Sequence, residues 1–275
     1  HSTTFGTHVE VLEMCELAEC RREVTEEDVC RKTEEFGRVF VIDPDCTPYE
    51  IERAARTSVA LDKLVARHGL GSLAYYYSST SGSEYENIVT SVIAGNTILT
   101  GKDIPVAGEY EVKNVQAMKI MSLMGRGGCF SEFYAVDYND DIVMLGHDGP
   151  SHFAIAEGDV HLVPLPVYHG KPGKGLSIQM SVKHGPVTLL SVVEEPNGIS
   201  LLIAEGESVP GPILHIGNIN SRYRFPISAK QFVKEWSRVG PSHHCAIGVG
   251  HSADILKKYA FMLGIPVHVI TKHDA

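Results

Sequence analysis

The character of the sequence changes near residue 127, and this change limits the folds that the chain can adopt. Up to that point, segments whose apolar residues have helical spacing alternate with short strand-like runs. Beyond it, β-rich runs follow one another with Gly, Pro and an Asn-Gly pair between them, at 141–146, 161–170, 175–185, 186–195 and 199–209. We therefore predict an open α/β sheet domain over residues 1–126, packed against a mainly antiparallel, β-barrel-like domain over residues 127–275, with flanking helices at 228–240 and 252–264.

The first strongly predicted helix, over residues 24–37, has signals at both ends. Thr25 is placed to cap its amino end, and Asp28 follows three residues later, as in a capping box. Gly37 is predicted to stop the helix, because glycine is common just after the last helical turn.

A second helix is predicted over residues 47–69, with Pro48 at its start and Gly69 at its end. The runs 38–43 and 72–77 on either side of it have the composition of short buried strands. Strand, helix and strand in this order are typical of a βαβ unit, so we expect the two strands to be parallel neighbours in one sheet.

Composition limits the expected partners and compartment. The formal net charge of −10 argues against a general nucleic-acid surface, which needs clustered Lys and Arg, and fits a neutral small substrate or a cation. The six cysteines form no CxxC pair and are expected to be reduced thiols, so we expect a cytoplasmic protein. No apolar run approaches the ~20 residues of a membrane span and no signal peptide is visible, so no membrane association is expected.

Four polar residues stand in apolar, glycine-rich segments where an unpaired charge would be costly: Glu109, Glu132, His147 and His244. Two carboxylates and two imidazoles would suit a divalent cation such as Mn²⁺, Mg²⁺ or Co²⁺. The absence of a thiolate set argues against structural zinc, although Cys245 follows His244 directly. Each residue also has a simpler interpretation: Glu109 as an acid capping the helix that it opens, and the histidines as structural residues. Their spacing in the sequence alone does not prove that the four side chains converge on one site.

The segments IPVAGEYEVKNVQAMKIM, GGCFSEFYAVDY, IVMLGHDGPSH and GPSHHCAIGVG, in this order and spacing, resemble the L-arabinose isomerase family. The resemblance implies a divalent metal, usually Mn²⁺, held by two Glu and two His, which fall on Glu109, Glu132, His147 and His244. His243 is the alternative to His244. Glu109 and Glu132 are then also expected to be the catalytic acid and base.

The resemblance implies an aldose–ketose isomerase that acts on an open-chain sugar. Family members form trimer-based homo-oligomers in which a neighbouring subunit completes the pocket. They carry a further N-terminal domain, so this chain is expected to begin within the middle domain and to be a catalytic core. Asp148 and Gly149 replace bulkier apolar residues of the family pattern. Another pentose or hexose, or a modified sugar, is therefore as compatible with the sequence as L-arabinose.

Two other functions remain open. A sugar- or metal-binding protein could keep the fold without turnover, although intact Glu109 and Glu132 argue against this. A metal-dependent epimerase or lyase acting on a sugar derivative could use the same residues. The products formed from a panel of sugars would separate these functions from an isomerase.

Overall fold

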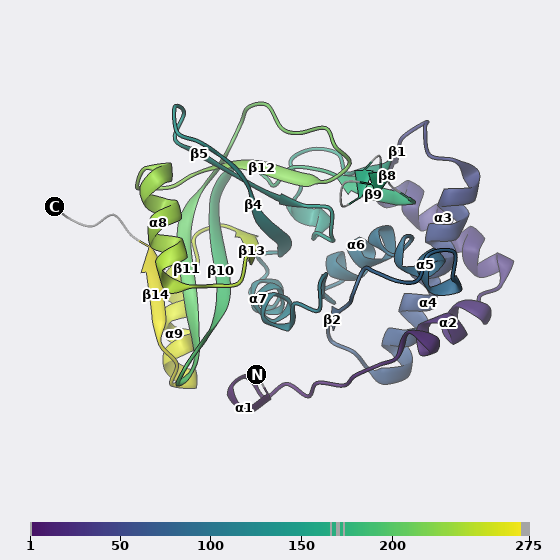
Figure 1. Cartoon of the computed structure of the whole chain (residues 1–275), viewed down its shortest axis with the longest axis horizontal. Helices are drawn as coiled ribbons and strands as arrows, with labels where there is room; N and C mark the ends of the chain where they lie inside the picture. Colours follow the sequence, from purple (N-terminus) through teal and green to yellow (C-terminus); the bar gives the residue numbers. More distant parts are fainter. Residues whose placement is uncertain (1, 166, 169–170, 173, 271–275) are drawn as a thin grey trace.

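A computed structural model describes residues 2–165, 167–168, 171–172 and 174–270 of the chain. Figure 1 shows a β-rich part with α8 and α9 on its outer side, and a helical part formed by α2 to α6. Helix α7 lies between the two parts, where it contacts β10 and β13 as well as β2 and β3. The chain is thus a mixed α/β structure.

Seven helices lie in the described residues of the first half of the chain. Their bounds are α1 (Ser2–Phe5), α2 (Met14–Arg22), α3 (Glu26–Val39), α4 (Pro48–His68), α5 (Glu84–Val89), α6 (Ile93–Gly101) and α7 (Val112–Leu123). Helix α6 is the central one, since every residue from Ile93 to Thr100 is buried. None of the helices in the described residues is both long and apolar enough to cross a membrane.

The two predicted helices are confirmed, with one correction at a helix end. Thr25 and Asp28 form the expected capping box at the start of α3, and Gly69 ends α4 with a φ of 62°. Gly37, however, does not stop α3, which continues to Val39. A glycine lowers helix stability by only about 1 kcal/mol, and the buried side chains of Phe36 and Phe40 hold the last turn against the core.

The predicted βαβ unit is wrong. Strand β1 (Val41–Ile42) pairs in parallel with β6 (His161–Pro164), which pairs with β9 (Leu176–Gln179), whereas β2 (Leu73–Ala74) pairs in parallel with β3 (Val106–Ala107). The first half thus contributes two-residue strands to two small sheets in place of one open sheet. A strand of two residues has too short an apolar pattern to determine which strand it pairs with. The packing of buried side chains from other parts of the chain determines the pairing instead.

A seven-stranded sheet forms the second half, in the order β10-β13-β4-β5-β12-β11-β14. Its strands are β4 (Cys129–Asp137), β5 (Ile142–His147), β10 (Gly185–Glu195), β11 (Gly198–Val209), β12 (Ile219–Arg224), β13 (His244–Val249) and β14 (Val267–Ile270). All its ladders are antiparallel except that between β11 and β14, as predicted for a mainly antiparallel domain. Strand β11 also pairs with β10, so the sheet bends back toward its first strand. That these strands enclose a barrel stays a prediction.

The remaining elements complete the second half. They are a short 3-10 helix η1 (Phe153–Ile155), β7 (Val167–Tyr168), β8 (Lys171–Pro172), and the expected helices α8 (Ala229–Val239) and α9 (Ala253–Leu263). The Asn-Gly pair noted in the sequence lies where β10 and β11 form a hairpin, but the two turn residues are Pro196 and Asn197, because Gly198 already pairs with Glu195. Positions 166 and 169–170 of the β-rich run 161–170 lie outside the described residues.

The larger hydrophobic core draws on both halves of the sequence. It includes Ile98 of α6, Leu162 of β6 and Leu189 of β10, all fully buried. Helix α6 packs against β9, and β1 pairs with β6, so the strands β6 and β9 lie with the helical part. The two halves of the sequence thus share one hydrophobic core, and a domain boundary after residue 126 stays a prediction.

Candidate metal centre

Three of the predicted ligands lie side by side because of the register of the sheet. His244, the first residue of β13, pairs with Glu132 of β4. On its other edge, Glu132 pairs with Gly146 of β5, and His147 follows Gly146 as the last residue of that strand. The backbone hydrogen bonds of β13, β4 and β5 thus bring together residues that are far apart in the sequence.

Glu109 reaches the same place from the turn between β3 and α7. Glu109 and Tyr110 have φ values of 57° and 53°, a left-handed conformation that is uncommon for residues other than glycine. The turn is held by hydrogen bonds from the backbone N–H of Tyr110 to the carbonyl of Tyr75, and from that of Glu111 to the carbonyl of Gly108. Glu109 therefore does not open the helix, as we had expected, because α7 begins at Val112 with Glu111 as its N-cap.

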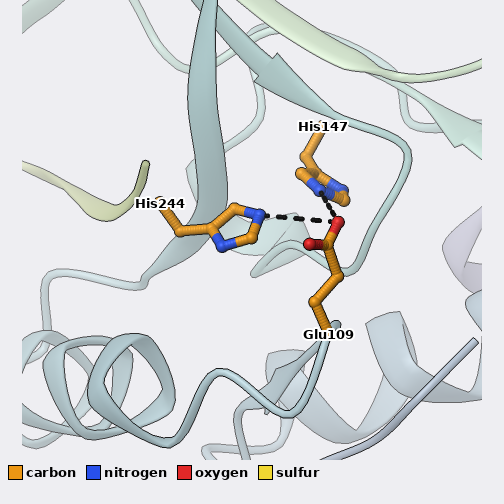
Figure 2. Close-up of side chains that lie close together, drawn as sticks. All are labelled: Glu109, His147 and His244. Carbon is orange, nitrogen blue, oxygen red and sulfur yellow. Dashed lines mark ion pairs between the residues drawn. The ribbon is translucent and has the colours of Figure 1, made fainter. Parts of the chain in front are cut away.

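The carboxylate of Glu109 faces three imidazoles. Its Oε1 lies 3.7 Å from Nε2 of His147 and 3.8 Å from Nε2 of His244, and Figure 2 shows both rings directed at this one oxygen. Its Oε2 lies 3.5 Å from Nε2 of His243. The interpretation of Glu109 as a capping acid is not supported, since its carboxylate points to the histidines.

All four predicted ligands belong to two overlapping groups that could hold a metal ion. The first is Glu109, His147 and His244, and the second is Glu132, His243 and His244; within each group the ligand atoms lie within 4.8 Å of one another. His243 joins the second group through a distance of 3.9 Å from its Nε2 to Oε2 of Glu132. The structure thus brings the expected residues together, and it keeps His243 in reach as the alternative. Metal binding by them stays a prediction.

The histidines are buried without the hydrogen bonds that a buried imidazole normally has. Within the described part of the chain, neither ring nitrogen of His244 has a hydrogen-bond partner, although the residue is only 1% exposed. Nδ1 of His147, in a residue that is 7% exposed, makes no well-aligned hydrogen bond either, although Oδ1 of Asp148 lies 3.0 Å from it. An unsatisfied buried polar atom costs about 1–3 kcal/mol. Nε2 of His244, which lies 3.8 Å from Oε1 of Glu109, therefore fits a centre in which its lone pair is donated to a cation, and the donor set of N and O atoms suits Mn²⁺, Co²⁺ or Mg²⁺.

The charges of the cluster influence one another strongly. Burial alone would lower the pKa of His147, but the neighbouring carboxylates of Asp148 and Glu109 outweigh it and raise the pKa to about 9. The same contact with His147 is the main cause that lowers the pKa of Glu109 to about 2. Burial lowers the pKa of His244. Glu109 is thus held as a carboxylate, the form in which it can bind a cation, whereas His147 must release its proton when it binds one.

Phe130 holds the two histidine rings from the core side. It is fully buried, and its ring centroid lies 4.3 Å from the rings of both His147 and His244. This role could not be predicted from the sequence, because an apolar residue in a β-strand is expected to be buried in any case.

Two further carboxylates adjoin the cluster and were not predicted as site residues. Oδ1 of Asp148 lies 3.0 Å from Nδ1 of His147, and Oε2 of Glu111 lies 3.5 Å from Nδ1 of His244. Asp148 had been noted only as a departure from the family pattern. Glu111 has no distinguishing signal, since acids are common near helix starts.

Compared with models of known protein families and with curated proteins, the sequence gives no match. Membership of the L-arabinose isomerase family therefore stays a prediction.

Proposed function

We propose that the chain is a metal-dependent aldose–ketose isomerase of the L-arabinose isomerase type, or the catalytic core of one. The observation that carries the proposal is the convergence of Glu109, His147 and His244 on one point, from three separate segments. The buried ring nitrogens of His244 without hydrogen-bond partners in the described residues support it, because a structural histidine would normally be satisfied.

Glu109, Glu132, His147 and His244 would hold the cation, which we propose is Mn²⁺, with Co²⁺ and Mg²⁺ as alternatives. When bound, such a cation would polarise the O1 and O2 oxygens of an open-chain sugar as a Lewis acid. His147 and His244 are buried, whereas the side chains of Glu109 and Glu132 are 28% and 32% exposed. The sugar would therefore approach from the side of the carboxylates.

Glu109 and Glu132 are the proposed acid–base groups. By the enediol route, isomerisation requires one proton to leave C2 and one to leave the O2 hydroxyl, while one proton arrives at C1 and one at the carbonyl oxygen O1. By the other route, a hydride moves from C2 to C1 and a proton moves from O2 to O1. Two partly exposed carboxylates, whose Oε2 atoms lie 3.5 Å and 3.9 Å from Nε2 of His243, can accept and donate these protons. Glu109 has both of its oxygens directed at histidines, so Glu132 is the better placed of the two to move toward a substrate.

The substrate is proposed to be a neutral sugar, which suits a chain of net charge −10. A homo-oligomer is proposed in which a neighbouring subunit completes the pocket. In support, Tyr110, next to Glu109, is 67% exposed and its ring stacks on that of the exposed Tyr76, with centroids 5.3 Å apart. Such a pair of exposed rings beside the centre would be covered in an assembly.

Turnover of a panel of aldoses with Mn²⁺, followed by analysis of every product, tests the proposal. The wild type is expected to form a ketose, Glu132→Gln is expected to form none, and His184→Asn is expected to form it as the wild type does. His184 is a suitable control because it lies in an ion pair with Glu157, away from the cluster. An epimer or an elimination product would assign the other enzyme class. Binding of Mn²⁺ and sugar without any product would assign the binding function.

A further inference from the structure

Each of the two buried histidines of the centre has one carboxylate near Nε2 and another near Nδ1. His147 directs Nε2 to Glu109 at 3.7 Å and Nδ1 to Asp148 at 3.0 Å. His244 directs Nε2 to the same oxygen of Glu109 at 3.8 Å and Nδ1 to Glu111 at 3.5 Å. Each ring thus lies between an inner carboxylate, that of Glu109, and an outer carboxylate, that of Asp148 or Glu111. The same arrangement occurs on two different strands, which distinguishes it from a single chance ion pair at the surface.

We infer that Asp148 and Glu111 are positioning residues, each of which holds the Nδ1 side of one histidine so that Nε2 faces the cation. The inference rests on the proposed metal centre. An acceptor at Nδ1 fixes which nitrogen carries the hydrogen and how the ring is turned, and it makes the other nitrogen a stronger donor to a metal. Neither Asp148 nor Glu111 needs to contact the cation or the sugar for this.

The backbone around Asp148 is shaped for this contact. Strand β5 ends at His147, and Asp148 lies in a bend, where its side chain is released from the strict alternation of a strand. Gly149 follows, and a Cβ atom there would lie 3.0 Å from Nδ1 of His147 and 2.8 Å from the ring of Phe130. The glycine thus leaves open the space beside Nδ1 that the carboxylate of Asp148 approaches.

Glu111 reaches the second histidine from the turn that also carries Glu109. Its side chain is only 12% exposed, and as the N-cap of α7 it makes no capping hydrogen bond with its side chain among the described residues. A mostly buried carboxylate that does not cap its helix requires another partner. Nδ1 of His244, which is completely buried, supplies one.

Packing alone does not select the ring nitrogen that faces Glu109. Phe130 contacts the faces of both imidazoles and restricts their tilt, but a ring turned over by 180° would occupy nearly the same volume. Only the polar neighbours distinguish the two orientations. The carboxylates of Asp148 and Glu111 can therefore determine which ring nitrogen faces Glu109, and hydrophobic packing cannot.

Titration of the metal-free chain with Mn²⁺, followed by calorimetry, tests the inference on Asp148→Asn and Glu111→Gln. Each variant is expected to bind one Mn²⁺ per chain with a Kd raised roughly 10- to 100-fold. Asp140→Asn, which removes the same charge from the β4–β5 turn, where Asp140 pairs with Arg222, is the matched control and should leave the Kd unchanged. Asp148→Glu, which restores a carboxylate, should recover part of the loss.

Two measurements separate positioning from other effects. The melting curves of the variants in EDTA should show one cooperative transition above the temperature of the titration, so that a raised Kd is measured on folded chains; a lower melting temperature is expected because each variant loses a contact with a buried imidazole. The increase in Kd should persist at roughly 1 M KCl, where the Debye length is ~3 Å and a general attraction of Mn²⁺ to negative charge is screened.

The outcomes distinguish the inference from the metal centre on which it rests. If the wild type binds Mn²⁺ and both variants bind it equally well, the positioning role is wrong and the metal centre stands. A loss that Asp140→Asn reproduces, or that disappears in salt, also overturns the positioning role. If the wild type binds no Mn²⁺, both the inference and the proposed centre are overturned.

Discussion

Glu132 and His244 lie opposite each other in the ladder between β4 and β13. This pairing, together with that of Glu132 and Gly146, fixes three of the four proposed ligands by backbone hydrogen bonds of one sheet. Side chains on rigid strands are placed more precisely than side chains on loops. Only Glu109 comes from a turn, and that turn is held in a left-handed conformation at two consecutive residues.

Replacing the carboxylate of Glu109 tests its double role as ligand and acid–base group. Glu109→Gln keeps the shape but removes the charge that faces His147 and His244, so Mn²⁺ binding should weaken and turnover should fall at least about 100-fold. Metal titration and steady-state assays measure the two effects. His184→Asn serves as the control and should change neither; unchanged activity in Glu109→Gln would show that the assignment is wrong.

Phe130, which packs against both buried histidines, is predicted to contribute strongly to the free energy of unfolding. Phe130→Ala leaves a cavity between two imidazoles and should lower the free energy of unfolding by about 3–5 kcal/mol. Urea unfolding of the metal-free chain measures the change. Phe261→Ala is the control, because this ring is 85% exposed, and its effect should stay within about 0.5 kcal/mol. Equal stability of the two variants would contradict the account of Phe130.

The buried end of α3 gives a prediction about pH. Burial alone would raise the pKa of Glu35, but the ammonium groups of Lys102 and Lys32, at 2.6 Å and 2.5 Å, outweigh it and lower the pKa below the ordinary value of 4.5. A carboxylate whose pKa is lowered by folding stabilises the protein above its unfolded pKa, and this contribution is lost as the pH falls.

Glu35→Gln should therefore unfold more easily than the wild type at about pH 7, by about 1–3 kcal/mol. The difference should shrink as the pH falls below 4.5, because the carboxyl of the unfolded wild type is then protonated, and it should vanish once the pH is below the lowered pKa of the folded carboxyl as well. Urea unfolding at several pH values measures it, with the exposed neighbour Glu34→Gln as the control. A difference that stays constant down to about pH 3 would show that the ion pairs with lysine are not its cause.

Gly37 lies in the interior of α3, on its exposed side, and not at its end. A Cβ atom there would meet no other described atom within 4 Å, so Gly37→Ala should raise the free energy of unfolding by about 0.5–1 kcal/mol. Gly69→Ala, in the left-handed residue that ends α4, should have the opposite sign. The same sign for both substitutions would contradict the assigned helix ends.

Local signals in the sequence predicted local structure well. The capping residues Thr25 and Asp28 act within one turn, so they place the start of α3 without knowledge of the rest of the chain. The partner of β1 could not be predicted in this way, because β6 follows it by more than a hundred residues and only the packing of the shared core brings the two together.

The candidate site shows the same division between local and long-range information. Its four main residues were found because charged groups in apolar, glycine-rich segments are conspicuous and because the four motifs resemble one family. Glu111 was missed, since an acid before a helix is ordinary in sequence and becomes notable only beside Nδ1 of His244. The conformation of Glu109 was also missed, because a positive φ at a residue other than glycine has no sequence signal.

The central claim is that this chain binds one divalent cation through the cluster around His244. Calorimetric titration of the metal-free chain with Mn²⁺, on the wild type and on His244→Ala, tests it most directly, with melting curves in EDTA to confirm that both chains are folded. The account predicts one Mn²⁺ per chain in the wild type and no measurable binding in the variant. Absence of binding in the wild type, or equal binding in His244→Ala, would contradict it.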